Sequence, residues 1–178
     1  MGGFTESCTG CCIWRLDLLI LVCVGASEYK LDRLLQYVDE LCDEGILDGK
    51  DIVAQIGNTD YQPRNYKGFS LIGRDEFQSY MEQANLIISH AGTGSVIPPL
   101  KLGKKVIVFP RLEKYHEHLD DHQLELRDVF TNAGYTLSAE NKDELVQAIE
   151  QAKSFQPKTF RSNNEKMNRL VIDYIESL

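Results

Sequence analysis

The chain has 178 residues, of which 43% are hydrophobic and 26% are charged, and its formal net charge at pH 7 is −8. This length is typical of one domain with a substantial buried core. The acidic balance argues against nucleic acid as a partner, because a duplex binder needs a basic face to displace counterions. No apolar run is long enough to predict a membrane-spanning helix.

The cysteines crowd toward the start of the chain, at Cys8, Cys11 and Cys12 among others. Their odd number does not describe a disulfide framework, and no second cluster follows at the spacing of a zinc site. We therefore expect reduced thiols and no metal site. Residues 1–17 also lack the basic start of a secretory signal. We expect them to form a disordered extension ahead of a cytoplasmic domain that covers residues 18–154.

From Leu18 onward, short apolar runs alternate with apolar stripes at helical spacing, which is typical of a parallel α/β sheet. Glycine or a polar cap stands at most of the boundaries between them. In chain order, the predicted elements are a strand at 18–24, a helix capped by Ser27, a strand at 51–56, a short strand near 69–72, a helix capped by Asp75, a strand at 86–89, a helix that ends near Leu102, a strand at 105–109, a helix from Gln123 to Ala133, an edge strand at 135–137 and a helix capped by Asn141.

The C-terminal segment 155–178 is expected to be a linker followed by an amphipathic helix. The polar stretch 156–164 resembles a hinge, and the residues after it draw one apolar stripe. This stripe either folds back on the domain's own sheet or docks on a partner protein. Its members are Met167, Leu170, Val171, Tyr174, Ile175 and Leu178.

The strand at 86–89 leads into the sequence Ser89-His90-Ala91-Gly92-Thr93-Gly94-Ser95. Glycines at two positions remove side chains, so that backbone N–H groups can approach an anion. The hydroxyl groups of Thr93 and Ser95 add donors at the positive end of the following helix. Glycine-rich turns also occur for steric reasons alone. The pattern therefore leaves two interpretations open, a diphosphate site or a tight turn without a ligand.

The loop from Arg111 to Gln123 is dense in histidine and carboxylate side chains. It follows the strand next to the Gly-rich turn, so it leaves the sheet at the edge where open α/β sheets bind ligands. Asp121 and Gln123 can hydrogen-bond sugar hydroxyls, and Arg111 can pair with phosphate. Such loops are more often solvated than metal-bound, because sites for hard cations usually need substrate phosphates to complete them. We expect no metal here.

Five motifs in chain order resemble the C-terminal, donor-binding half of family 28 glycosyltransferases. The resemblance covers about residues 19–149. It extends to the small stand-alone members that act in the synthesis of dolichol-linked oligosaccharide and of bacterial exopolysaccharide. The motifs are Val24-Gly25, Gln55-Ile56-Gly57, Ile88 to Ser95, Leu102-Gly103-Lys104 and Asp121-His122-Gln123-Leu124-Glu125.

The resemblance implies a Rossmann-like parallel sheet that forms one half of a GT-B glycosyltransferase split over two chains. This chain would supply the UDP-sugar half, and a membrane-attached partner would present a lipid-linked diphosphate saccharide as acceptor. The implied reaction is an inverting transfer of a hexose or N-acetylhexosamine, carried out on the cytoplasmic side and peripheral to the membrane. Neither a cofactor nor a divalent cation is expected, because helix N-termini and basic side chains neutralise the leaving UDP in such enzymes.

The resemblance also implies site residues: His90, Gly92, Thr93, Gly94 and Ser95 at the diphosphate, Asp121, His122 and Gln123 at the sugar, and Gly25 and Ser27 along the cleft. Arg111 is expected at the diphosphate because of its charge and its place in the loop. The proposed reaction needs a base to accept the proton of the acceptor hydroxyl, and Glu117 and His118 are the local candidates unless the partner supplies it.

Two positions depart from the family pattern. Members usually carry an acidic residue for the ribose on the helix after the Gly-rich turn, where this chain has Pro98. The first loop usually reads Gly-Thr, and here it reads Gly25-Ala26-Ser27. These departures support a second hypothesis, a non-catalytic subunit that binds the nucleotide sugar or acts as a scaffold.

Overall fold

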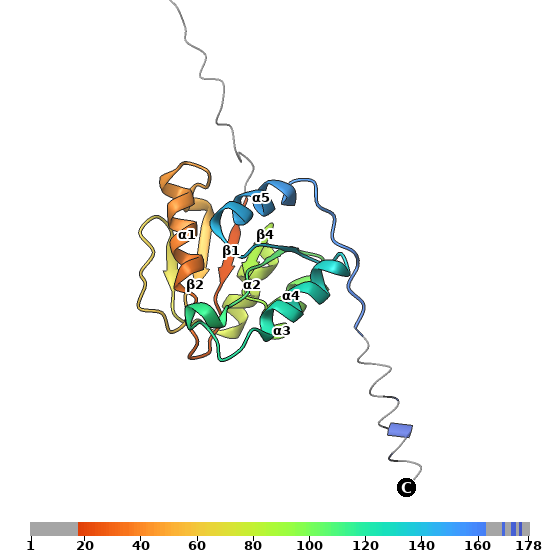
Figure 1. The fold of residues 1–178 in the computed structure, drawn as a ribbon. Coiled ribbons are helices and arrows are strands. Elements are labelled where there is room, and N and C mark those ends of the chain that lie inside the picture. The colour runs from red at the N-terminus through yellow and green to blue at the C-terminus, as the bar shows by residue number, and fades with distance from the viewer. Residues whose placement is uncertain (1–17, 163–168, 170–171, 174, 176–178) are drawn as a thin grey trace, which may run out of the picture.

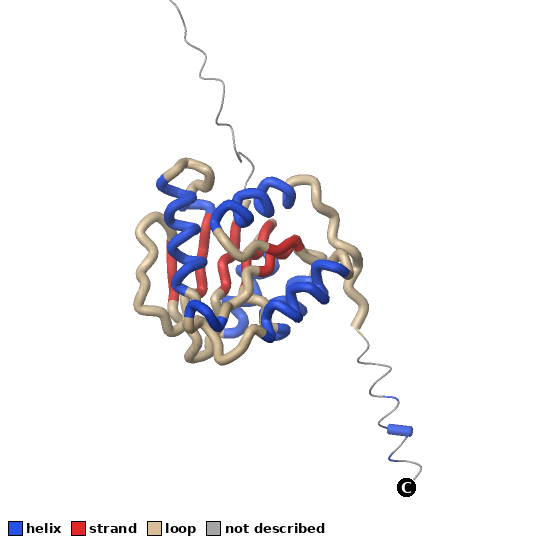
Figure 2. The backbone as a smooth tube through the Cα atoms, viewed as in Figure 1, coloured by secondary structure: helices blue, strands red, loops and turns tan. Residues whose placement is uncertain are grey.

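The structure is a computed structural model that describes residues 18–162, 169, 172–173 and 175. In these residues, parallel strands form one sheet in the order β3-β2-β1-β4-β5-β6 (Figures 1 and 2). From β1, the strands β2 and β3 follow toward one edge of the sheet, and β4, β5 and β6 follow toward the other edge. The strands are β1 (Ile20–Cys23), β2 (Ile52–Gln55), β3 (Lys67–Phe69), β4 (Leu86–Ser89), β5 (Lys105–Val108) and β6 (Leu137–Ser138).

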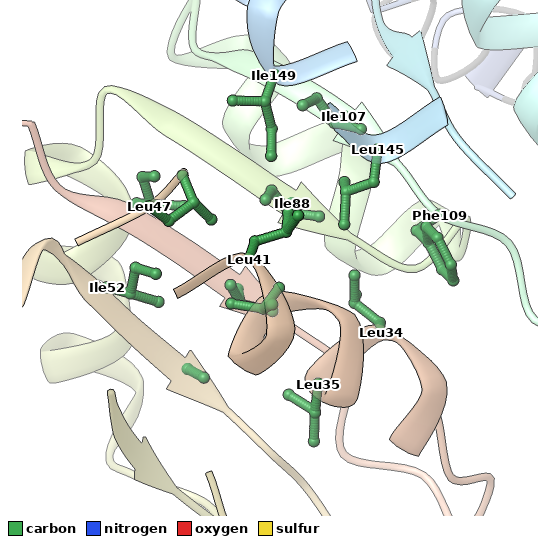
Figure 3. Close-up of a cluster of buried hydrophobic side chains, with 14 of the residues drawn as sticks. Leu34, Leu35, Leu41, Leu47, Ile52, Ile88, Ile107, Phe109, Leu145 and Ile149 are labelled. Carbon is green, nitrogen blue, oxygen red and sulfur yellow. The ribbon is translucent and has the colours of Figure 1, made fainter. Parts of the chain in front are cut away.

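The helices cover both faces of the sheet. Alternate strand residues point to opposite faces. Ile20 and Val22 therefore pack with α1 and α5, whereas Leu21 packs with α2, α3 and α4. Figure 3 shows Leu34 of α1 and Leu145 of α5 in the first of these clusters. The helices are α1 (Asp32–Asp43), α2 (Arg74–Gln83), α3 (Thr93–Lys101), α4 (His122–Asn132) and α5 (Lys142–Ala152), with 3₁₀ turns at Gly49–Asp51 and Glu113–Tyr115.

The strands and helices predicted within residues 18–154 are confirmed, with shorter strands and shifted boundaries. Ser27 does not cap α1, which begins at Asp32 after an exposed loop. The carbonyl groups of Val24 and Tyr29 accept hydrogen bonds from Arg111, which holds this stretch as a loop. Other boundaries shift by one to three residues: α2 begins at Arg74 rather than after Asp75, α4 begins at His122, β3 covers Lys67–Phe69 and β6 covers Leu137–Ser138.

The predicted cap of α5 is confirmed. The Asn141 side chain accepts a hydrogen bond from the backbone N–H of Glu144 at 2.9 Å. Glu144 returns the contact one residue earlier than a standard capping box, because its carboxylate accepts from the N–H of Glu140 at 2.8 Å. Two otherwise unpaired backbone donors at the start of the helix are thereby satisfied.

Part of the predicted C-terminal linker is attached to the domain. The N–H of Lys158 donates to the carbonyl of Gly134 at 3.0 Å, and the rings of Phe160 and Tyr135 lie 5.4 Å apart. No helix within the described residues is long and apolar enough to cross a membrane. The predicted extension 1–17 and most of the apolar stripe, namely Met167, Leu170, Val171, Tyr174 and Leu178, lie outside the described residues.

Candidate functional site

The strand order reverses between β1 and β4, which are neighbours in the sheet: β2 and β3 are added on one side of this pair, and β5 and β6 on the other. The chain leaves β1 for α1 on one face and leaves β4 for α3 on the opposite face. Loops that diverge in this way open a crevice at the carboxyl edge, and this is where open α/β sheets bind their ligands. The two loops are 24–31 after β1 and 90–92 after β4, and the second one is the start of the Gly-rich turn.

The Gly-rich turn presents backbone donors at the start of α3. Gly92 is the N-cap, and its carbonyl accepts the N–H groups of Ser95 at 3.0 Å and Val96 at 3.1 Å. The N–H groups of Thr93 and Gly94 belong to the first two helical residues and so have no intrahelical acceptor. Both residues are exposed. An anion can therefore bind these donors at the positive end of the helix.

Two glycines are required by the position of His90. A Cβ atom on Gly92 would lie 2.3 Å from Cε1 of His90, and one on Gly25 would lie 2.7 Å from its Nε2. Gly25 also has a φ of +87°, which disfavours any residue with a side chain. The first loop and the Gly-rich turn thus close on the same imidazole ring.

Both nitrogens of the His90 ring are hydrogen-bonded within the protein. Nδ1 accepts the backbone N–H of Gly92 at 3.0 Å, and Nε2 lies 2.7 Å from Oγ of Ser95. The side chain is only 9% exposed. Burial, reinforced by the nearby charge of Arg111, lowers the pKa of His90 to about 3. His90 is therefore an uncharged ring beneath the turn at physiological pH.

Arg111 is buried between the first loop and His90. It is 2% exposed, and its Nη2 donates to the carbonyl groups of Val24 and, at 3.0 Å, Tyr29. Its Nη1 lies 3.3 Å from Nδ1 of His90, and its Nε has no partner within the described part of the chain. Burial lowers the pKa of this guanidinium. Nη2 of Arg111 thus holds the first loop, and the pairing of Arg111 with phosphate stays a prediction.

Gln123 links the segments that follow β4 and β5. Its Oε1 accepts the backbone N–H groups of Ala91 at 3.2 Å and Arg111 at 3.1 Å, and the side chain is 5% exposed. Two backbone donors thus occupy this oxygen, and the contact of Gln123 with the sugar stays a prediction. Asp121 and His122, which precede it, are exposed beside the same edge.

Glu117, a predicted base candidate, is held in a buried ion pair. Its carboxylate accepts from Nε and Nη2 of Arg33, both at 2.9 Å, and from the N–H of Leu112 at 3.0 Å. The Arg33 guanidinium lies 4.4 Å from the ring centre of Phe109 and 4.7 Å from that of Tyr115. These contacts tie α1 to the loop from Arg111 to Gln123, hereafter the charged loop. They favour a structural role for Glu117 over proton abstraction.

His118, the other base candidate, is oriented by a residue that the sequence reasoning missed. Its Nδ1 lies 2.9 Å from Oδ1 of Asp120, and its ring lies 4.6 Å from that of Tyr29. Asp120 also accepts the N–H of His122, a contact that, with His118, holds the pKa of its carboxyl below the usual range. A carboxylate on one imidazole nitrogen leaves the other nitrogen free to accept a proton. The sequence pattern that could have identified Asp120 is a carboxylate two residues after a histidine.

A separate pocket of about 450 Å³ lies between α1 and the charged loop. Two of its cations are already paired, Lys30 with Asp60 and Arg33 with Glu117. The carboxylate of Asp32, which accepts a hydrogen bond from the Thr59 hydroxyl, also lines it. Across the described residues, no cluster of three or more His, Cys, Asp or Glu side chains could hold a metal ion. The pocket is lined by Lys30, Asp32, Arg33, Gln36, Tyr37, Tyr115, His116 and Glu117.

Sequence comparison finds one family and a consistent group of relatives. The profile of the Glycosyltransferase family 28 C-terminal domain matches residues 19–174. The UDP-N-acetylglucosamine transferase subunit ALG13 of Candida albicans is 45% identical over 111 residues, which cover 62% of this chain and 35% of that protein. ALG13 of Saccharomyces cerevisiae is 33% identical over 98 residues, which cover 54% and 46%. The chain spans half or less of the length of the curated relatives it matches.

Solved structures confirm the predicted Rossmann-like fold, and the similar folds belong to GT-B glycosyltransferases and epimerases. A solution structure of ALG13 matches with a TM-score of 0.52 at 21% identity and covers 86% of this chain and 94% of that one. The UDP-GlcNAc 2-epimerase of Methanocaldococcus jannaschii, solved with UDP-GlcNAc and UDP, matches with a TM-score of 0.63 at 15% identity. The match covers 90% of this chain and 46% of the epimerase.

Proposed function

Because the chain belongs to glycosyltransferase family 28, as its C-terminal domain, we propose that it is the subunit that binds the UDP-sugar donor. The observation that carries this proposal is the free end of α3. Thr93 and Gly94 present exposed backbone donors there, at the crevice between β1 and β4. A diphosphate matches such donors in charge and in size, and the helix dipole favours it further.

The proposed reaction transfers a hexose or N-acetylhexosamine to a lipid-linked diphosphate saccharide. The curated relatives are named as subunits of a UDP-N-acetylglucosamine transferase. By analogy with that naming, a second protein would supply the acceptor half. A membrane-attached partner would bring the lipid-linked acceptor to the crevice, with this chain on the cytoplasmic side.

In the proposed mechanism, an acceptor hydroxyl attacks the anomeric carbon of the donor and inverts its configuration. The bond between that carbon and the diphosphate oxygen breaks, and UDP leaves with its charge against the N–H groups of Thr93 and Gly94. The proton of the hydroxyl passes to Nε2 of His118, while Asp120 holds Nδ1. The positive end of α3 takes the place that a divalent cation has in other transferases.

A calorimetric titration of the purified chain with UDP tests the donor assignment, with GDP and ADP as controls. We expect UDP to bind and the two purine nucleotides to bind more weakly. Two results would contradict the assignment. One is equal binding of all three nucleotides, and the other is no binding of UDP, either to the chain alone or to the chain mixed with membranes that contain its partner.

A non-catalytic subunit is the second candidate function. Its support is Pro98, which replaces the usual acidic residue and lies within α3, and the ion pair that occupies Glu117. A transfer assay with labelled UDP-sugar and the membrane fraction separates the two functions. Lipid-extractable label that depends on the chain and falls in the His118→Gln variant supports catalysis. UDP binding together with transfer that does not require the chain supports the scaffold role.

A further inference from the structure

We infer that the pocket between α1 and the charged loop binds a saccharide through hydrogen-bonding side chains, and that this saccharide is the sugar of the acceptor. The identity of the sugar as the acceptor rests on the proposed function, whereas the affinity of the pocket for saccharides follows from its lining. The pocket holds about 450 Å³, which is within the range of about 300–1,000 Å³ that is usual for small-molecule sites. It is therefore large enough for a sugar.

The charges that line the pocket balance one another. Arg33 and Glu117 form a buried ion pair, with side chains that are only 11% and 8% exposed. Lys30 and Asp32 supply one further cation and one further carboxylate, and both bind other groups of the protein. The Lys, Arg, Asp and Glu side chains of the pocket thus leave no excess of either sign to attract a nucleotide diphosphate or a metal ion.

The other side chains of the lining have hydrogen-bonding groups without partners. They are Gln36, Tyr37, Tyr115 and His116. Within the part of the chain that the structure describes, the amide, the two phenols and the imidazole make no hydrogen bond. Each of these groups can both donate and accept. Saccharide hydroxyl groups also do both, so the lining matches a saccharide better than an apolar or a charged ligand.

His116 has an uncommon backbone conformation. Its φ of +57° is in the left-handed region, and among the described residues only glycines share a positive φ. Glycine adopts this conformation without strain, whereas a residue with a Cβ atom is strained there. No hydrogen bond of the imidazole to another described residue offsets this strain. The imidazole lines the pocket, where a bound saccharide supplies the missing contact.

The pocket adjoins the proposed base. The rings of Tyr29 and His118 lie 4.6 Å apart, and the adjacent residues in the two segments, Lys30 and Glu117, line the pocket. A sugar in the pocket therefore lies beside His118, as an acceptor hydroxyl that loses its proton must. The helices α1 and α3 pack on opposite faces of the sheet, so the pocket is separate from the donors at the start of α3. This separation favours the acceptor over the donor as the source of the sugar.

The direct test is a titration of the ¹⁵N-labelled full chain with the methyl glycosides of glucose, galactose and N-acetylglucosamine, followed by the side-chain amide signals. We expect saturable shifts of the Gln36 amide with at least one glycoside. The amide of Gln147, an exposed residue of α5 that does not line the pocket, should not shift. No saturable shift of Gln36 with any of the three glycosides would overturn the inference. Because the titration needs neither UDP nor a partner, its failure is distinct from a failure of UDP to bind.

Two variants separate contact with the saccharide from a structural role. Gln36→Ala should weaken binding of the glycoside about three- to tenfold, as expected for one lost hydrogen bond. His116→Gly removes the imidazole together with the backbone strain, so it should weaken binding to a similar degree while the denaturation midpoint stays the same or rises. Gln147→Ala is the matched control and should keep the affinity. Unchanged affinity in both pocket variants would contradict the inference.

Transfer kinetics test whether the sugar belongs to the acceptor. In the assay with the membrane fraction, Gln36→Ala should raise the amount of membrane fraction needed for half-maximal transfer and leave the corresponding concentration of UDP-sugar unchanged. A rise confined to UDP-sugar would assign the pocket to the sugar of the donor and overturn the acceptor assignment.

Discussion

The Gly-rich turn and the charged loop lie at the same edge of the sheet, yet they use their polar groups in opposite ways. The turn has few charges, and it leaves the donors of Thr93 and Gly94 exposed. The charged loop at 111–123 has many charged side chains, and several of them contact groups of the protein itself, as in the ion pair of Glu117 with Arg33. A ligand site is therefore indicated by donors that lack an acceptor, and a high density of charge is a poorer guide.

The largest expected effect is on the loop side of this comparison. Glu117→Ala leaves the Arg33 guanidinium buried without its carboxylate, and breaking such a pair typically lowers the free energy of unfolding by about 3–5 kcal/mol. Chemical denaturation measures the loss. Glu117→Gln keeps an oxygen for the N–H of Leu112 and should be less destabilising. A loss below about 1 kcal/mol in Glu117→Ala would show that the pair does not hold the loop.

The same Gln variant tests whether Glu117 acts as the base. We expect Glu117→Gln to retain transfer in the membrane assay in proportion to its folded fraction, since the structure gives this carboxylate a structural partner. A loss of transfer greater than about 100-fold in a folded variant would return the base assignment to Glu117.

On the turn side, Gly92 and Gly94 form a matched pair. Gly92→Ala places a Cβ atom 2.3 Å from the His90 ring, and we expect it to lower the free energy of unfolding by about 1–3 kcal/mol and to abolish UDP binding. Nothing lies within 4 Å of the Cβ position on Gly94. Gly94→Ala should therefore keep the stability, while its methyl group weakens UDP binding at the exposed helix end. Equal stability of both variants would contradict the packing of His90 against the turn.

Acid stability should reflect the buried His90. Its pKa is about 3 in the folded chain against an ordinary 6.5, so below pH 6.5 the unfolded chain binds a proton that the folded chain does not. The free energy of unfolding therefore falls as the pH decreases from 6.5 toward 3, by at most about 1.4 kcal/mol per pH unit from this group. Chemical denaturation at pH 7.5 and at pH 5 should show that the free energy of unfolding falls less in His90→Gln than in the unmodified chain. The exposed His122→Gln is the control, and an equal fall in the two variants would refute the prediction.

The smallest effect is expected at an exposed pair on the rim of the pocket. Lys30 and Asp60 are 48% and 91% exposed in their side chains, and such pairs contribute little to stability because water and salt screen them. Asp60→Ala should leave the denaturation midpoint unchanged within error. A clear decrease would mean that charges around the loop matter even where they are solvated.

The sequence predicted most of the fold, because apolar runs and stripes report directly on strands and helices that pack in a core. It also located the Gly-rich turn, whose sequence is local. It did not show contacts between residues that lie far apart in the chain. Arg111 contacts Val24 from 87 positions away, and Glu117 contacts Arg33 from 84 positions away. No local pattern shows that these charges are buried, and the position of Ser27 in a loop has the same origin.

The central claim is that the diphosphate of the donor binds at the free end of α3. The measurement that tests it most directly is a titration of the ¹⁵N-labelled chain with UDP, followed by backbone amide chemical shifts. We predict saturable shifts at Gly92, Thr93, Gly94 and Ser95, and smaller ones at Gly25. Saturable shifts centred on the pocket between α1 and the charged loop, with none at the turn, would contradict it.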